Sequence, residues 1–322
     1  VDDPAGNLGG YRMRADLGRG LALETEDNGT LEQADALEAT AVGGTLVASI
    51  AGAGPSGDSG DTFRIGNLDA GNTVAVTWVV PESSVASIGD WEIALESGSG
   101  PNPVGVSTDG TLSVTTSEAG GYFLRVALAA TPDLLSQYLV QVLVTDGVAP
   151  RVTDTSLPAE GSSTDRGVDA FSLVFSEDMD GDAVENPANY DLRSAGSDAV
   201  FGTEDDAVYG VESLGYDGGL TLAFRIPDGP LQPGMIRFTA GTGLTDRVGN
   251  ALEEPYVRAF SVVPQPGVIL EAPNNDGMAT ATPLVETVGE ASGSVVHGQA
   301  WPAGSRPYAI VSGDFNSDDH MD

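Results

Sequence analysis

The last residues of the sequence have the types and spacing of a calcium loop. Asp314, Asn316, Asp318 and Asp322 form the pattern D-x-N-x-D-x-x-x-D. Calcium prefers about six to eight oxygen ligands, and alternate side chains in a turn can direct carboxylate and amide oxygens to one point. The pattern therefore predicts a calcium site, and the alternative is an acidic tail that binds no ion.

A second acidic segment runs from Asp198 to Asp206 and is centred on Gly202. It includes Glu204 and Asp205 and lies between two predicted strands. Its carboxylates could form a calcium turn, and the alternative is an ordinary exposed hairpin.

The groups that most enzymes use for catalysis are largely missing. Both histidines, His297 and His320, lie near the C-terminal end, and the chain has no cysteine. A Ser-His-Asp site in the preceding modules and a cysteine-based zinc site are therefore excluded. The glycine-rich segment 52–61 lacks the Gly-Lys-Ser/Thr of a phosphate-binding loop, and no carboxylate pair stands out as a glycosidase pair. We expect no catalytic activity.

The charge of the chain favours cations as partners. There are 48 acidic residues against 13 basic ones, all arginine, and the formal net charge is −35. Such a field repels nucleic acid and anionic membranes, and it suits a salty exterior where screening weakens self-repulsion. No apolar run is long enough to cross a bilayer. The opening residues VDDPAGN do not have the pattern of a leader peptide, so we expect any export signal upstream.

Short apolar runs with a period of two predict an all-β chain. Hydrophobic residues make up 40%, with 43 Gly and 19 Pro, which favours strands joined by tight turns. Val74, Val76 and Trp78 would share one face of a strand, so Trp78 is predicted to lie in a core. Trp91 and Trp301 could instead stack on sugar rings. Strands are predicted at 45–50, 62–65, 73–80, 91–95, 111–115, 122–128, 138–145, 170–175, 206–211, 220–226, 235–240 and 256–263.

Two signatures recur along the chain in a fixed order. Segment 23–37 returns without a gap at 270–284, and an Asp-x-x-Gly-Asn pentapeptide precedes each copy, at 3–7 and at 246–250. Such recurrence is typical of a tandem array of modules. We therefore expect the sequence to be a fragment of a longer protein.

Three motifs stand out in segment 21–146. They are Glu24-x-Glu26-x-Asn28, Asp58-Ser-Gly-Asp61-Thr-Phe63 and Gly120-Gly-Tyr122-Phe-Leu-Arg-Val126. Together they resemble the bacterial pre-peptidase C-terminal (PPC) domain, a small β-sandwich of secreted peptidases and other exported proteins. In that family the head residues bind calcium beside the linker. The residues that the resemblance implies here are Glu24, Glu26 and Asn28, joined by Asp58 or Asp61. The alternative is a solvated acidic linker.

Segment 147–263 contains four landmarks in order. They are Phe175-Ser-Glu177-Asp-Met179, Asn189-Tyr190-Asp-Leu192, Pro230-Leu-Gln-Pro-Gly234 and Leu244-Thr-Asp246-Arg-Val-Gly249-Asn250. They resemble the bacterial Ig-like domain of surface and S-layer-type proteins, which implies an Ig-like sandwich. The C-terminal segment, through Gly313 to Asn316, resembles the start of an FG-GAP calcium repeat, with a dockerin calcium loop as the alternative.

The resulting prediction is a fragment of tandem β-sandwiches. It comprises the tail of a preceding Ig-like module (1–20), a PPC-like, jelly-roll-type sandwich (21–146), an Ig-like sandwich (147–263), the head of a further PPC-like module or a linker (264–290), and a truncated calcium repeat (291–322). We expect a non-catalytic structural or adhesive segment of a secreted or cell-surface bacterial protein, built from monomeric modules stiffened by Ca²⁺. Matrix protein or polysaccharide are the candidate partners. The alternative function is an accessory substrate-binding region of a secreted peptidase or glycoside hydrolase.

Overall fold

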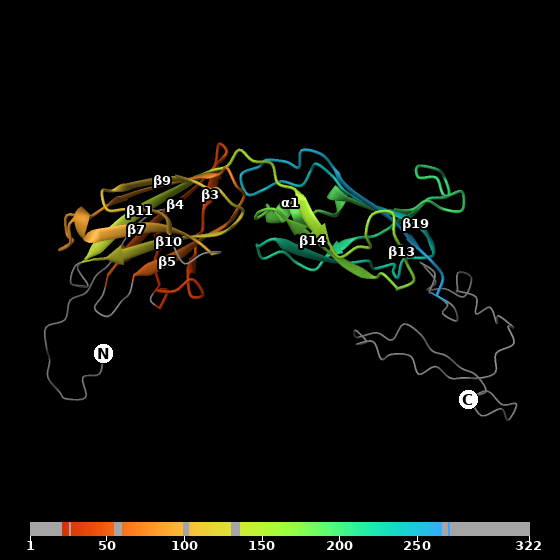
Figure 1. The fold of residues 1–322 in the computed structure, drawn as a ribbon, viewed down its shortest axis with the longest axis horizontal. Coiled ribbons are helices and arrows are strands. Elements are labelled where there is room, and N and C mark those ends of the chain that lie inside the picture. Colours follow the sequence, from red (N-terminus) through yellow and green to blue (C-terminus); the bar gives the residue numbers. More distant parts are fainter. Residues whose placement is uncertain are drawn as a thin grey trace, which may run out of the picture.

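Two β-sandwiches, arranged end to end in a shallow arch, make up the described part of the molecule (Figure 1). The computed structural model describes residues 21–25, 27–54, 60–98, 103–129, 136–265 and 270. The expected all-β class is confirmed, because strands dominate and the helical elements of these ranges are only three to five residues long. Within the same ranges no helix is long and apolar enough to cross a bilayer.

The first sandwich is formed by two sheets around one core. Its elements are β1 (Ala22–Leu23), β2 (Asp35–Ala36), β3 (Thr40–Val42), β4 (Thr45–Ala53), β5 (Asp61–Leu68), β6 (Thr73–Val79), η1 (Ile88–Asp90), β7 (Trp91–Ser97), β8 (Pro103–Ser107), β9 (Thr111–Thr115), β10 (Gly120–Leu128) and β11 (Gln137–Thr145). One sheet has the order β1-β4-β11-β6-β9, with β3 beside β4, and the other has β2-β5-β10-β7-β8. In the central strand β11, Tyr138, Val140, Val142 and Val144 are buried, because alternate side chains point to the same face.

The second sandwich has the same two-sheet construction. Its elements are β12 (Val152–Thr155), β13 (Ser163–Thr164), β14 (Ala170–Phe175), α1 (Gly181–Glu185), η2 (Pro187–Asn189), β15 (Tyr190–Ser194), β16 (Ala207–Tyr209), β17 (Glu212–Ser213), β18 (Thr221–Arg225), β19 (Gly234–Ala240) and β20 (Tyr256–Val262). The sheets have the orders β12-β14-β18-β17 and β13-β20-β19-β15-β16. Phe171 stacks on Phe224 with 4.9 Å between ring centroids, and Tyr190 and Phe238 contact this pair edge-on.

The strands predicted from alternation are confirmed, since each overlaps an observed strand, and Trp78 is buried as predicted. The structure adds strands that were not predicted, among them β8, β12 and β15. In β8 the apolar residues Val104 and Val106 are exposed on an edge strand, whereas Gly105 and Ser107 are half-buried. The valines therefore do not mark a buried face in the sequence.

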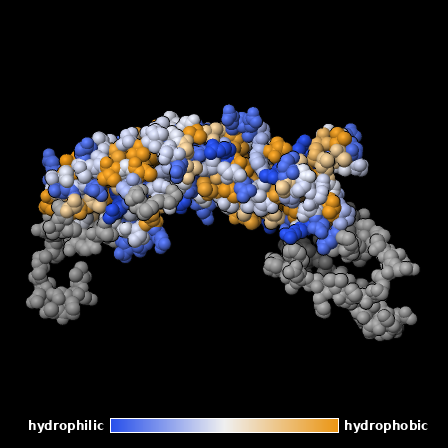
Figure 2. Space-filling model, viewed as in Figure 1, coloured by the Kyte–Doolittle hydropathy of each residue, from blue (hydrophilic) through white to orange (hydrophobic). Residues whose placement is uncertain are grey.

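Each sandwich buries its own hydrophobic cluster. The largest fully buried side chains are Trp78, Trp91, Tyr122, Tyr138, Phe175, Phe224, Phe238, Phe260, Ile50, Ile93, Leu95 and Leu124. On the outside, hydrophobic residues occur in patches among hydrophilic ones on the viewed face (Figure 2). The two cores give each sandwich an independent source of stability.

Gly52 in β4 is expected to be sensitive to substitution. It pairs directly with Tyr138 of β11, and a Cβ atom there would lie 2.1 Å from the tyrosine ring. We expect Gly52→Ala to lower the free energy of unfolding by about 1–3 kcal/mol through overpacking. Chemical denaturation measures this, and Gly89→Ala is the control because a Cβ at Gly89 meets no atom within 4 Å. Equal losses in the two variants would contradict the packing argument.

The predicted segments 1–20 and 291–322 lie outside the described residues, as does most of 264–290. The second copy of the head signature and the C-terminal calcium loop therefore remain predictions.

Candidate metal centre at the junction of the two sandwiches

Polar contacts join the end of β5 to the loop after β14. Asn67 donates from its N–H and Nδ2 to the Asp178 carboxylate at 3.0 and 2.6 Å, and the Asp178 N–H donates to the Asn67 carbonyl at 3.2 Å. Arg247 Nη1 donates to the Ile65 carbonyl at 3.0 Å. Gly66 lies between these contacts with φ of 133°, and a Cβ there would be 2.6 Å from Asp178. We call Asn67, Asp178 and Arg247 the polar latch.

Other contacts cross the junction at the linker itself. Arg151, next to β12, pairs with Asp69 of the β5–β6 turn, with Nη1 2.8 Å from the carboxylate. Asn250 Nδ2 donates to the carbonyls of Asp146 and Val148, each at 3.3 Å. The side chain of Val248, two residues before Asn250, packs against the core of the first sandwich. The loop 246–250 of the second sandwich is therefore held against the first.

Three buried carboxylates meet inside this junction. Asp146 directly follows β11, Glu177 follows β14, and Asp246 opens the loop 246–250. One oxygen from each lies within 4.8 Å of an oxygen from the other two, although the side chains come from both sandwiches. We call these residues the acidic triad.

Local hydrogen bonds position two members of the acidic triad. Asp246 Oδ1 accepts the N–H groups of Val248, Gly249 and Asn250 at 2.9, 2.8 and 2.9 Å, which is the geometry of an aspartate that closes its own turn. Asp146 Oδ1 accepts the Val148 N–H at 2.9 Å. These bonds fix the carboxylates while leaving lone pairs for a further partner.

The third member, Glu177, has no such support. Its Oε1 is buried and has no hydrogen-bond partner among the described residues. Burial, contact with Asp146 and the nearby charges of Asp246 and Asp69 raise the pKa of Glu177 to about 9. Burial also raises the pKa of Asp246, although its turn opposes the shift. Closely spaced carboxylates out of water favour either a shared proton or a bound cation, so the acidic triad could hold a metal ion.

Two of the calcium residues predicted from the PPC resemblance, Asn28 and Asp61, lie away from the acidic triad. Asp61 begins β5, at the opposite end of the strand from the junction, and accepts a hydrogen bond from Tyr138 at 2.6 Å. Asn28 is close to it, since the Asn28 carbonyl accepts the Thr62 N–H at 3.2 Å, and its Nδ2 donates to Asp35 at 3.0 Å. The structure thus brings Asn28 and Asp61 to one region.

The other predicted ligands are placed only in part. The Glu24 N–H donates to the Ala51 carbonyl at 3.2 Å, beside β4. Glu26, Asp58 and the loop from Asp314 to Asp322 lie outside the described residues. The predicted head site and C-terminal loop therefore stay predictions.

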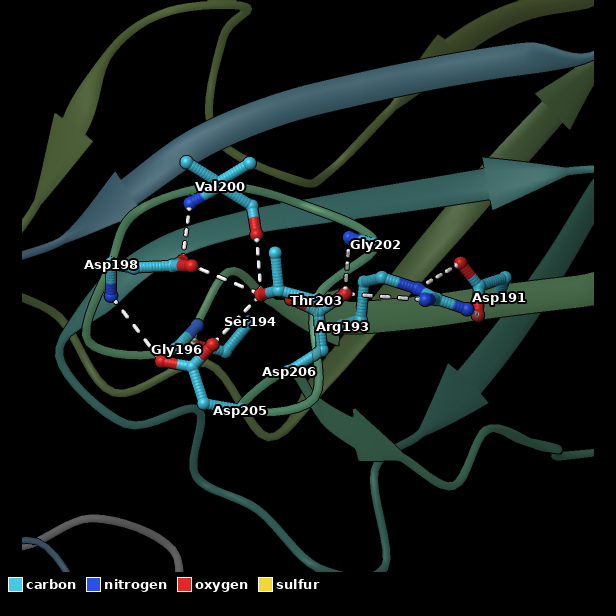
Figure 3. Close-up of polar contacts among 10 residues, drawn as sticks. All are labelled: Asp191, Arg193, Ser194, Gly196, Asp198, Val200, Gly202, Thr203, Asp205 and Asp206. Atoms are coloured by element: carbon cyan, nitrogen blue, oxygen red, sulfur yellow. Dashed lines mark hydrogen bonds and ion pairs between the residues drawn. The ribbon is translucent and has the colours of Figure 1, made fainter.

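The acidic segment 198–206 is a hairpin turn, as one of the two interpretations of the sequence had it, because β15 and β16 pair antiparallel on either side. Figure 3 shows its carboxylates turned toward groups of the same turn. Asp205 accepts from the Ser197 N–H at 2.7 Å and from Thr203 Oγ1 at 2.7 Å. The hydrogen bond from Thr203 has the largest effect on the pKa of Asp205, and together with the bonds from Ser197 it lowers this pKa to about 2. Calcium binding by this turn stays a prediction.

Sequence reasoning missed the acidic triad, although two of its members stood in recognised motifs. Glu177 lies in the landmark Phe175 to Met179, and Asp246 opens the repeated Asp-x-x-Gly-Asn signature. The recurrence of that signature was the available signal, because its aspartate and asparagine are the residues that reach across the junction. Nothing in the spacing of 146, 177 and 246 shows that the three carboxylates meet.

The fold and the junction define the molecule as a two-sandwich all-β protein with a metal-competent joint. No family model matches the chain, and no curated protein matches it. Among solved structures, the N-terminal part of the bacterial S-layer protein SbsC is 18% identical over 36% of this chain and 24% of its own, with a TM-score of 0.26. The PliG lysozyme inhibitor of Aeromonas hydrophila is 15% identical over 34% of this chain and 95% of its own, also with a TM-score of 0.26.

A longer SbsC structure, domains 1–6, gives the same TM-score of 0.26 and is covered over 14% of its length. The chain thus spans less than a quarter of either S-layer structure. At these TM-scores the structural similarities support no conclusion about function. The geometry of the junction between the two sandwiches is therefore the basis for assigning one.

Proposed function

We propose that this chain is a non-catalytic structural or adhesive segment of a secreted or cell-surface protein, in which calcium stiffens the joint between two sandwiches. The observation that supports this is the acidic triad. Its carboxylates belong to both sandwiches, so one ion bound there would tie the two bodies together. The polar latch already holds the sandwiches together, and an ion would add a second restraint.

Calcium suits the acidic triad better than other common ions. All three ligands are hard oxygen donors, which calcium and magnesium prefer over softer metals. Magnesium needs near-ideal octahedral geometry at about 2.0–2.1 Å and keeps its waters, whereas calcium accepts irregular shells at about 2.3–2.6 Å. Ligands carried by two separate β-sandwiches cannot easily contract to the smaller geometry. The net charge of −35 would also draw divalent cations to the chain.

Burial supports a structural rather than a catalytic role for the proposed ion. Asp146, Glu177 and Asp246 are 8%, 2% and 2% exposed, so a substrate would have to displace the junction to reach the ion. Catalytic metal sites keep an open position for water or substrate, whereas structural sites are closed by the protein. The formal net charge of −35 fits a salty extracellular setting, where screening weakens self-repulsion.

The proposal predicts a joint that calcium makes rigid. Because the natural chain has no cysteine, a Glu82→Cys/Asp165→Cys variant can be labelled at one exposed site in each sandwich. We expect the distance distribution between two spin labels to be narrow in calcium and broad in chelator. Magnesium at the same concentration should leave the distribution broad.

Calcium binding to the same protein is measured by calorimetry. Micromolar to millimolar affinity is expected, the range of extracellular calcium modules and sensors. If the distance distribution is identical in calcium and in chelator, the ion does not stiffen the joint and the proposed function fails.

A further inference from the structure

An asparagine of the first sandwich is buried beside the acidic triad. Asn72, in the turn between β5 and β6, is 0% exposed, and its Oδ1 has no hydrogen-bond partner among the described residues. A buried amide oxygen without a partner is costly, so native proteins rarely leave one. Its presence points to a partner that is not part of the polypeptide.

The position of Asn72 is fixed by its other groups. Its N–H donates to Thr116 Oγ1 at 3.0 Å, and its carbonyl accepts the Thr116 N–H at 2.8 Å. At the other end, Nδ2 donates to Asp146 Oδ2 at 3.0 Å. Since Oδ1 and Nδ2 share one carbon atom, the unsatisfied oxygen is held next to the Asp146 carboxylate.

Two buried oxygens without a hydrogen-bond partner among the described residues therefore lie in the junction region, one from each sandwich. Asn72 Oδ1 comes from the first, and Glu177 Oε1 comes from the second. Water could satisfy either oxygen, and a proton shared among the carboxylates could reduce their charge, but neither does both. A divalent cation would satisfy both oxygens and neutralise the charge.

We infer that Asn72 supplies a fourth protein ligand to the calcium ion, through its side-chain oxygen. This inference rests on the proposed function and deepens it. Asn72 and Asp146 then bind the ion from the first sandwich, and Glu177 and Asp246 bind it from the second. The ion would be shared evenly, which is the arrangement that couples the two bodies most directly.

A neutral fourth ligand also suits the charge of the site. The three carboxylates already exceed the charge of one calcium ion. The nearby Asp69 carboxylate adds to the negative charge, and Arg151 offsets part of it through an ion pair of 2.8 Å. An amide oxygen increases the number of ligands without more repulsion in the metal-free state.

Calcium calorimetry on the full chain tests the role of Asn72. The site at the junction is identified as the one that Glu177→Gln removes, which separates it from any calcium bound at other acidic segments. We expect Asn72→Ala to weaken calcium binding at this site by about 10-fold or more. Asn72→Asp, which keeps a side-chain oxygen at this position, should bind calcium with an affinity within about threefold of that of the natural chain.

The outcomes separate the inference from the proposed function. If Asn72→Ala binds calcium at the junction as well as the natural chain does, Asn72 is not a ligand, and the proposed function is untouched. If the natural chain has no site that Glu177→Gln removes, the proposed function fails too. A cooperative thermal transition of Asn72→Asp in chelator shows that the variant is folded without calcium, so a loss of binding in both variants would also overturn the inference.

Discussion

Replacing Glu177 by glutamine is expected to abolish the calcium response of the junction while leaving the metal-free protein at least as stable as the natural chain. Glutamine has the shape of the protonated glutamate and keeps an oxygen at the same place, but it carries no charge. We expect calcium affinity at this site to fall by on the order of 100-fold, because one of three carboxylate ligands is lost.

Without calcium, Glu177→Gln should stabilise the chain, and the pH dependence of the free energy of unfolding shows why. The pKa of Glu177 rises from 4.5 to about 9 on folding. Between these values the folded chain keeps a proton that the unfolded chain has released, so the stability of the natural chain should fall as pH rises from about 4.5 to about 9. The variant Glu177→Gln has no titratable group at this position, so it should not lose this stability as pH rises. In chelator, the difference in stability between the variant and the natural chain should therefore grow toward pH 9.

Thermal unfolding in chelator and in calcium, from pH 5 to pH 9, measures both effects. The control is Glu253→Gln. Glu253 is exposed, and its replacement removes one negative charge, as Glu177→Gln does. The control should keep the calcium-dependent rise in melting temperature. If Glu177→Gln destabilised the chain in chelator and retained the rise in calcium, Glu177 would be a structural group that no ion contacts.

The fold was predictable from the sequence to the extent that burial is periodic. In β6 and β11 every second residue faces a core, so alternation identified them. β15 was missed because it is short and its inward residues are mixed: Tyr190 is only partly buried and the buried Ser194 is polar, so Leu192 is its one buried apolar residue. Edge strands such as β8 bury few side chains, so their sequences show no periodic pattern of buried apolar residues.

The acidic triad was not predictable in the same way. Its members come from the ends of separate strands and one loop, and they meet only because two sandwiches dock end to end. Sequence spacing predicts ligands within one turn, as at Asp314 to Asp322, since there the backbone alone brings them together. A site assembled by docking has no such local pattern. Its only trace was the recurrence of Asp246 and Asn250 in a repeated signature.

Replacing Phe224 by alanine is expected to destabilise the second sandwich strongly and, without calcium, to leave the first unchanged. Phe224 is 1% exposed, stacks on Phe171, and contacts Tyr190 edge-on at 4.8 Å. Removing the ring from such a core costs about 3–5 kcal/mol, which lowers the melting temperature of a domain of this size by roughly 10–20 °C. The core of the first sandwich contains none of these residues.

Differential scanning calorimetry in chelator should therefore show one transition that moves and one that stays. Trp78→Ala in the first core is the reciprocal variant and should move the other transition. Calcium changes the expectation, because an ion with ligands on both sides binds only while both sandwiches are folded. The first sandwich of Phe224→Ala should then lose its calcium stabilisation at the temperature where the second unfolds. If both transitions moved together in chelator, the polar latch alone would make the two sandwiches one cooperative unit, and calcium would not be needed to couple them.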